Sequence, residues 1–513
     1  MINLFQSGIN RLLGSMLFIL IVVSFISYFI YGPYFSPDSV NYFHYATHLF
    51  DAHPWADIYS PFYPFVLYDL LLLPNLSLFQ AAHFLILVQY VLGVVFLYLL
   101  GKNIAQIQIF NLPRRNTLIL FLLIPYHTWW SFRIIGWVHA DALFYFLLIT
   151  WFYLLSIHYL RRSLQSLLLL SFVGALLIWT KNNALILIPF LLLLVILDKS
   201  KIKWWVPLLT VTASYLVYQF LFPQNILVNN LRDGSTPSYF SLASLELLGN
   251  NFGELFRSSL GFLLSDVAAS LIPQTTAMLG GIIFITVLAF VAVSEVRKGL
   301  TFPSYFYLFG WVYLICLLLF QQATFYEEIN FRTLFPFFVP CSWFVCIKWI
   351  CINNKRWIYM IMIGLVMTLH TVVGHLILWN RENVNSLFEV GRMKETELFE
   401  TILGVNNQVP SPEILLVSDQ PEKLGLMLNH PYVAEWNANH HFIKGKRRAI
   451  TEADKLNSLN LYLDNLKQGK AVAVLFCGNG PGLESAQKNG LLILGFPEGL
   501  IIIHPSLYPY GRK

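Results

Sequence analysis

The sequence has few charged residues for its length. Asp, Glu, Lys and Arg make up 12% of the 513 residues, whereas hydrophobic residues make up 57%. A soluble domain usually carries about 25% charged residues. Most of this chain therefore has too little polar surface for water, which excludes an ordinary soluble protein and favours a lipid bilayer as its solvent.

Cysteines and clustered basic residues are also scarce. The five cysteines have neither the spacing of a zinc site nor that of a disulfide framework. They are Cys316, Cys341, Cys346, Cys351 and Cys477. The formal net charge of +6 is not gathered on one basic face, so nucleic acid is not an expected partner. The absence of an internal repeat argues against an inverted-repeat transporter.

Long apolar runs fill residues 1–380, whereas residues 381–513 have the composition of a globular domain. In lipid, backbone polar groups must be satisfied within the segment, so such runs predict helices. The first run, Leu12–Tyr31, is long enough to cross a bilayer. No small-residue cleavage site follows it, so we expect a retained helix and not a signal peptide. Eleven spans are predicted, near residues 12–31, 78–101, 116–135, 141–160, 164–180, 184–198, 204–222, 277–295, 302–320, 333–350 and 357–379.

The distribution of basic residues predicts the orientation. Lys and Arg gather in alternate connections, such as 102–115, 161–162 and 199–203. The positive-inside rule assigns these connections to the cytoplasm. The N-terminus is then cytoplasmic, and the C-terminal domain lies outside a plasma or inner membrane. The acidic residues of the membrane part lie mostly on the outer side. Either longer polar loops or chemistry on that face explains this distribution.

Two predicted outer loops are long, at residues 32–77 and 223–276. Within the first, residues 61–74 are too short and too proline-bounded to span a bilayer, so they predict a helix at the membrane interface. Residues 242–272 in the second loop are typical of short amphipathic helices. Neither loop has the composition of a flexible linker.

The first outer loop begins with a predicted helix from Ser36 to Phe50. One face of it, an arc of roughly 140°, carries Asp38, Asn41, His44, His48 and Asp51. Asp38 is either a helix cap or a functional carboxylate at the membrane surface. His44 and His48 have the i, i+4 spacing that can hold a metal, although histidines in an aromatic-rich interfacial loop commonly bind none. A divalent metal is therefore possible but not required.

Polar residues also stand at the outer ends of later spans. Asp141 opens the fourth predicted span two residues after His139, and an acid there is costly unless it is paired or functional. Arg133 is the nearest basic residue in sequence, so a structural ion pair is the alternative. Lys181 marks a further outer turn. Side chains at consecutive outer turns could converge on one cavity.

The late outer loop carries Glu327, Glu328 and Arg332, followed by Thr-Leu-Phe-Pro. A guanidinium can hold a phosphate by two-point contact and keeps its charge at a membrane surface. Arg332 is therefore a candidate phosphate ligand. The alternative is an ion pair with Glu327 or Glu328.

These residues, in this order, resemble the GT-C membrane glycosyltransferases. The resemblance rests on an acid just after the first span, the segment YSPFYPF (59–65), an acid opening the fourth span, and the turn NFRTLFPF. It is nearest to the protein O-mannosyltransferase and aminoarabinose-transferase branch. It implies that Asp38 matches the catalytic acid, Asp141 the acid of the second outer loop, and Arg332 the late arginine near the lipid phosphate. This chain has a single Asp38 and no Asp-X-Asp pair.

The implied activity is transfer of a sugar from a polyprenyl-phosphate donor to a hydroxyl or amine of a lipid, glycan or protein acceptor. Asp38 would take the acceptor proton, and Arg332 would stabilise the departing phosphate. His139, Lys181, Tyr63 and Glu327 are further candidate substrate-binding residues. One displacement with one base predicts inversion at the anomeric carbon. A transporter or flippase for a lipid-linked sugar, or a polysaccharide polymerase or ligase, remains the alternative.

The C-terminal residues alternate between strand and helix patterns, which predicts a small α/β domain. Strands are expected near residues 413–418, 471–476, 491–495 and 499–503, and helices near 421–429 and 452–467. The glycine-rich segment 477–482 follows a strand and could cradle a phosphate, but it lacks the P-loop lysine. Acceptor recognition or covering of the active site is the alternative role. The predicted fold is thus mainly α: a GT-C-like transmembrane bundle of about 11 spans with a small extracytoplasmic α/β C-terminal domain.

Overall fold

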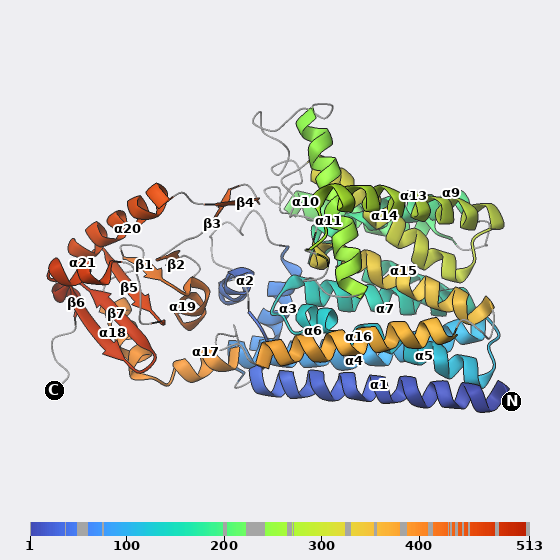
Figure 1. Cartoon of the computed structure of the whole chain (residues 1–513), viewed down its shortest axis with the longest axis horizontal. Coiled ribbons are helices and arrows are strands. Elements are labelled where there is room, and N and C mark those ends of the chain that lie inside the picture. Colours follow the sequence, from blue (N-terminus) through green and yellow to red (C-terminus); the bar gives the residue numbers. More distant parts are fainter. Residues whose placement is uncertain are drawn as a thin grey trace. The chain divides into compact units, whose positions relative to one another are not determined.

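The protein is mainly helical, with a five-stranded sheet and a separate two-stranded hairpin near its C-terminus (Figure 1). The computed structural model describes residues 2–35, 37–48, 60–73, 76–198, 203–221, 242–263, 269, 271–323, 330–352, 357–379, 387–408, 414–428, 430, 433–436, 440–443, 446–449, 452–477 and 482–508.

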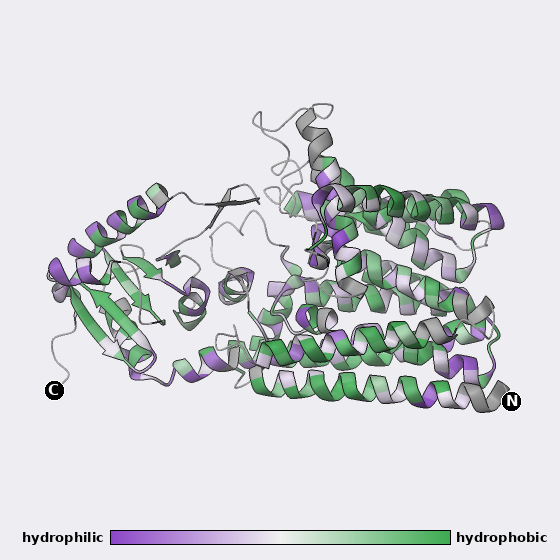
Figure 2. Ribbon diagram, in the orientation of Figure 1, coloured by the Kyte–Doolittle hydropathy of each residue, from purple (hydrophilic) through white to green (hydrophobic). Residues whose placement is uncertain are grey.

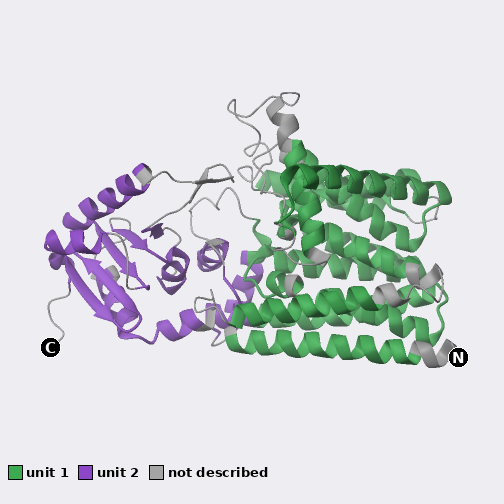
Figure 3. Ribbon diagram, in the orientation of Figure 1, with its two compact units in different colours: residues 1–30, 53–63, 84–382 green, residues 31–52, 64–83, 383–513 purple. Residues whose placement is uncertain are grey.

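The chain forms two compact units (Figure 3). The first comprises residues 1–30, 53–63 and 84–382, and the second comprises residues 31–52, 64–83 and 383–513. The division at residue 382 lies near the predicted boundary at residue 380. The second unit, however, also takes in two stretches of the first predicted outer loop and its flanks, so it is more than the C-terminal domain alone.

Helices make up the first unit, and apolar residues run along most of them (Figure 2). Among the described residues, six helices are long and apolar enough to cross a membrane. They lie in α1 (Ile2–Tyr31), α4 (Leu78–Ile107), α7 (Ala140–Arg161), α13 (Gln274–Lys298), α14 (Phe302–Ala323) and α16 (Trp357–Trp379).

The first unit contains further helices besides these six. They are α5 (Leu112–Tyr126), α6 (Trp129–Ile135), α8 (Leu164–Thr180), η1 (Asn182–Ile186), α9 (Leu187–Leu197), α10 (Trp205–Leu221), α11 (Leu242–Leu263) and α15 (Phe331–Ile352). The predicted span 116–135 is divided in two. Thr128 caps α6 by accepting a hydrogen bond from the Ser131 amide, and Pro125 lies in the last turn of α5. An N-cap residue has an extended backbone, so the helix cannot continue through it.

Helices α1 and α16 run in the same direction. Gly364, in the first half of α16, lies so close to Met16 and Leu13, in the first half of α1, that an added Cβ atom would contact both side chains. Late in both, the Ser27 hydroxyl lies 2.5 Å from His375 Nδ1 and accepts a hydrogen bond from the Trp379 indole at 2.9 Å. The two helices therefore finish at the same end of the bundle.

That end of the bundle also holds the segment that leads into α7. The Phe132 ring of α6 packs edge-on against the His375 ring, with centroids 4.7 Å apart. At the opposite end, Asn10 near the start of α1 accepts a hydrogen bond from Thr117 near the start of α5. Asp141, in the first turn of α7, thus lies at the end where α1 and α16 finish.

The second unit contains a five-stranded sheet of order β2-β1-β5-β7-β6. Strand β1 (Leu415–Ser418) pairs in parallel with β2 (Val433–Glu435) and β5 (Ala471–Leu475), whereas β7 (Gly499–Ile503) is antiparallel to both β5 and β6 (Leu492–Phe496). The β5 strand is buried along its whole length. A separate hairpin joins β3 (His440–Ile443) and β4 (Lys446–Ala449). The sheet agrees with the predicted α/β domain.

The helices of the second unit come from both ends of the sequence. From the first predicted outer loop come α2 (Pro37–Thr47) and most of α3 (Phe62–Leu71). From the C-terminal part come α17 (Leu387–Met393), α18 (Glu397–Gln408), α19 (Pro421–Leu428), α20 (Glu452–Lys467), α21 (Leu483–Lys488) and η3 (Pro505–Leu507). Helix α19 packs against both α2 and α17.

Candidate functional site

Asp141 lies in the first turn of α7, and the residue before this helix fixes its backbone. His139 has an extended backbone, and its Nδ1 accepts a hydrogen bond from the Asp141 amide at 3.0 Å. The same Nδ1 lies 3.0 Å from Asp141 Oδ2. The accepted hydrogen bond requires Nδ1 to be unprotonated, so the neutral ring carries its proton on Nε2. A proton on Nδ1 would instead pair His139 with the carboxylate.

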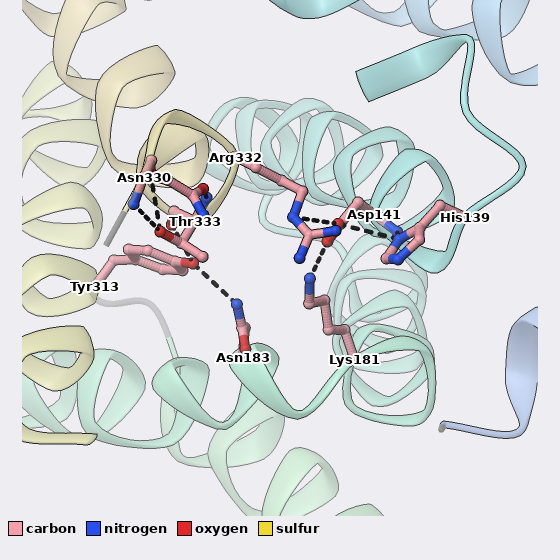
Figure 4. Close-up of polar contacts among 8 residues, drawn as sticks. All are labelled: His139, Asp141, Lys181, Asn183, Tyr313, Asn330, Arg332 and Thr333. Atoms are coloured by element: carbon pink, nitrogen blue, oxygen red, sulfur yellow. Dashed lines mark hydrogen bonds and ion pairs between the residues drawn. The ribbon is translucent and has the colours of Figure 1, made fainter. Parts of the chain in front are cut away.

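Lys181 is the direct ionic partner of Asp141 (Figure 4). It follows the last residue of α8, and its extended backbone ends that helix before η1 begins. Its ammonium donates to Asp141 Oδ1. Lys181, and not Arg133, therefore supplies the structural ion pair that the sequence left open.

Arg332 reaches the same carboxylate from a third helix. Its Nε lies 3.6 Å from Asp141 Oδ2. The Asp141 side chain is only 9% exposed, and among the described residues no donor meets hydrogen-bond geometry at Oδ2. The buried carboxylate thus has one oxygen held by Lys181 and one that faces His139 and Arg332.

The start of α15 is fixed by reciprocal hydrogen bonds. Asn330 Oδ1 accepts from the Thr333 amide and Thr333 Oγ1 accepts from the Asn330 amide, both at 3.0 Å. This capping box satisfies two amides at the helix start. The Tyr313 hydroxyl donates to the Thr333 carbonyl oxygen at 2.9 Å and accepts from Asn183 at 3.2 Å. Arg332 therefore projects from a rigid first turn.

Two guanidinium groups lie near the face of the Trp137 ring. The Cζ atoms of Arg133 and Arg332 lie 5.9 and 5.8 Å from the centre of its ring, within the range of cation–π attraction. Its ring also lies 6.2 Å from the His139 ring. Trp137 was not predicted from the sequence, although its position between Arg133 and His139 was a usable signal.

Tyr63 also belongs to this site. Its side chain is fully buried, and its hydroxyl interacts with the backbone of His139. The structure therefore brings together five residues singled out from the sequence, namely Tyr63, His139, Asp141, Lys181 and Arg332. Within the described part of the first unit, two of them, Lys181 and Arg332, place positive charge beside the buried Asp141 carboxylate.

The remaining candidates belong to the second unit or lie outside the described residues. Asp38 and His44 are in α2 and His48 directly follows it, all within the second unit, and Glu327 lies outside the described residues. The His44 and His48 rings are 4.4 Å apart, and His48 Nδ1 lies 2.9 Å from the His44 carbonyl oxygen. No group of three or more His, Cys, Asp or Glu in the described part of the chain could hold a metal. The metal pair stays a prediction.

Two backbone amides where the glycine-rich segment begins after β5 already donate hydrogen bonds to a carboxylate. The Asp419 carboxylate accepts from the Phe476 amide at 2.8 Å and from the Cys477 amide at 2.9 Å. An anion bound at these two amides would have to displace a carboxylate. Residues 478–481 lie outside the described residues. This arrangement argues against a phosphate at the start of the segment.

The sequence matches no protein-family model and no curated protein. The structure is similar to ArnT from Cupriavidus metallidurans, at 13% identity and a TM-score of 0.42, over 97% of this chain and 98% of ArnT. It is also similar to the Archaeoglobus fulgidus oligosaccharyltransferase, at 12% identity and a TM-score of 0.42. That match covers 82% of this chain but 63% of the oligosaccharyltransferase, so this chain spans less than two thirds of that protein's length.

Proposed function

We propose that the protein is a membrane glycosyltransferase that moves a sugar from a polyprenyl-phosphate donor to an acceptor hydroxyl or amine on the extracytoplasmic face. The observation that carries the proposal is Arg332, which projects from the capped start of α15 and lies 3.6 Å from the buried Asp141 carboxylate that Lys181 also binds. A helix start and a guanidinium both attract anions. A phosphate is therefore the ligand that this geometry supports best.

The site chemistry follows from where charge develops. When the bond between the anomeric carbon and the phosphate oxygen breaks, the phosphate keeps the electron pair and gains negative charge. Arg332 stabilises that charge, and a water-poor pocket strengthens the effect. Trp137 fixes the plane of the guanidinium, and the Asp141 carboxylate holds Arg332 and Lys181 in position.

Asp38 accepts the proton from the acceptor in this proposal. The acceptor oxygen or nitrogen attacks the anomeric carbon as the phosphate leaves, so the configuration inverts. An unperturbed aspartate, with a pKa of about 3.9, is a weak base. Asp38 therefore acts best where lipid or substrate excludes water from it.

The test measures transfer of radiolabelled sugar from synthetic polyprenyl-phosphate donors, in membranes with equal amounts of wild type, Asp38→Asn, Arg332→Gln and Glu295→Gln. Glu295 is a matched control, since it is buried and pairs with Lys348 at 3.0 Å in another part of the first unit. We expect loss of transfer in Asp38→Asn with donor binding retained, loss of donor binding in Arg332→Gln, and transfer in Glu295→Gln. If wild type shows no transfer and no donor hydrolysis with any sugar, but moves the donor across the bilayer, the flippase alternative replaces this proposal.

A further inference from the structure

The helix that carries Asp38 is part of the second unit and packs into it. Its buried face consists of Ser39, Val40, Tyr42, Phe43 and Ala46, all at most 5% exposed. Asp38, Asn41 and His44 lie on the other face and are partly exposed. This division fits the amphipathic pattern of the sequence. It leaves Asp38 outside the packed face while that face is held firmly.

One close contact joins α2 to α19. A Cβ atom at Gly425 would lie 3.0 Å from Val40 Cγ1 and 2.9 Å from the His430 carbonyl oxygen. Only a glycine allows α19 to approach Val40 this closely without a shift. Val40 is two residues after Asp38, so any movement at this contact is passed to the start of α2.

Helix α19 is in turn fixed to the rest of the second unit. Lys423 is only 7% exposed, and its ammonium lies 2.5 Å from Glu389 Oε1 of α17. The same ammonium lies 4.7 Å from the centre of the Phe476 ring, just after β5. The Asp419 carboxylate, between β1 and α19, binds the Phe476 and Cys477 amides. The position of α19 is therefore set by the sheet.

A second contact path reaches α2 through an aromatic pair. The Phe43 ring packs edge-on against Phe79 of α4, with centroids 5.7 Å apart. The ammonium of Lys394, which follows α17, lies 4.4 Å from the Phe79 ring centre. Two independent paths thus run from the C-terminal residues to the buried face of α2.

From these contacts we infer that the C-terminal α/β fold is a positioning element for Asp38, acting through the Gly425–Val40 contact. The inference rests on the proposed role of Asp38 as the base. A displacement of about 1 Å in a reacting group can cost about 100-fold in rate. The sheet fixes α19, and Gly425 lets α19 pack closely against α2. Together these contacts restrict such displacement. Val40 and Gly425 are positioning residues and touch no substrate.

The first experiment loosens or shifts the contact. Val40→Ala removes the side chain that Gly425 faces, and Gly425→Ala pushes α19 away from it. Leu491→Ala is the matched control, since Leu491 is 7% exposed and lies just before β6, at the edge of the sheet opposite β1 and β2. We expect Val40→Ala and Gly425→Ala to lower kcat by about 10- to 100-fold with the donor KM unchanged. We expect Leu491→Ala to keep kcat. Equal kcat in all three variants, at equal amounts of folded protein, overturns the inference.

The second experiment locks the contact. In a Cys477→Ser background, the Val40→Cys and Gly425→Cys pair is close enough for a disulfide, detected as joined fragments after protease cleavage. A locked protein with a kcat equal to or higher than that of its own reduced form, beside a slowed Val40→Ala variant, supports positioning. A locked protein that loses transfer until it is reduced overturns it, because α2 must then move against α19.

The two proposals fail in different ways. If the disulfide forms but wild type transfers no sugar from any donor, the proposed function fails while the packing stands. If Asp38→Asn retains full transfer while Val40→Ala is slowed, Asp38 is not the base and the inference about Asp38 falls with it.

Discussion

Asp141 and Lys181 are 40 residues apart in the chain, yet they form an ion pair where α7 begins and α8 ends. A second buried pair, Glu295 with Lys348, joins the last turn of α13 to α15, and Glu295 also accepts from the Ser304 hydroxyl at 2.7 Å. The described part of the first unit therefore has two buried carboxylates of similar exposure, Asp141 and Glu295, each with a lysine partner. They allow stability and function to be separated.

Asp141→Asn is expected to lower both stability and sugar transfer. Removing one partner of a buried ion pair leaves an uncompensated charge, at a cost of about 3–5 kcal/mol. The double variant Asp141→Asn with Lys181→Met should recover part of the loss in melting temperature in detergent, but not the transfer activity. Glu295→Gln should lower the melting temperature and keep transfer. Inactivity of Glu295→Gln at equal folded amounts would show that the assay reports stability alone.

Arg332→Lys is expected to weaken donor binding although it keeps the charge. Lysine is a point charge without the planar fork that binds a phosphate at two points and stacks on an indole. Hydrogen bonds to charged groups contribute about 1.5–3 kcal/mol each, so we expect the donor KM to rise by about 10- to 100-fold. Trp137→Leu should have a smaller effect in the same direction. Unchanged donor KM in Arg332→Lys would mean that Arg332 does not bind the phosphate.

The capping box at the start of α15 predicts a graded series at Asn330. Asn330→Asp keeps an acceptor for the Thr333 amide, whereas Asn330→Ala leaves that amide unsatisfied, at a cost of about 1 kcal/mol. We expect Asn330→Ala to lower the melting temperature and raise the donor KM, since Arg332 lies in the loosened turn. Asn330→Asp should stay close to wild type in both. An Asn330→Ala variant that is less stable but binds donor normally would separate the cap from the site.

Lys394 predicts a pH dependence of stability in the second unit. Burial lowers the pKa of Lys394 from its ordinary value of 10.5. Between this lowered pKa and 10.5, the unfolded chain binds more protons than the folded chain, so stability rises as pH increases. Lys394→Met should remove this rise. The measurement is resistance of the second unit to limited proteolysis from about pH 7 to 10. The exposed Lys467 supplies the control Lys467→Met, which should keep the wild-type slope.

The sequence predicted the helical architecture and most of the polar cluster, for identifiable reasons. Apolar runs specify helices in lipid whatever their neighbours, and Asp141, Lys181 and Arg332 each stood out as charges beside such runs. Their pairing could not be predicted, because it depends on which helix ends meet. Arg133 was nearer to Asp141 in sequence than Lys181, and sequence distance was the wrong guide.

Other features depended on tertiary packing. The break at Thr128 was missed because the surrounding run is apolar enough to predict one span from 116 to 135. The packing of α2 on α19 was also outside the reach of the sequence. The contact is made by Val40 and Gly425, and no local sequence pattern indicates that these two residues meet.

The parallel pairing of α1 and α16 bears on how the protein is made. Ser27 and His375 are 348 residues apart, and a ribosome adds about 5–20 residues per second. The first helix therefore waits for about 20–70 s before its late partner leaves the ribosome. During that interval its serine-bearing face must meet lipid or an insertion factor, and release from that temporary partner would mark completion of the bundle.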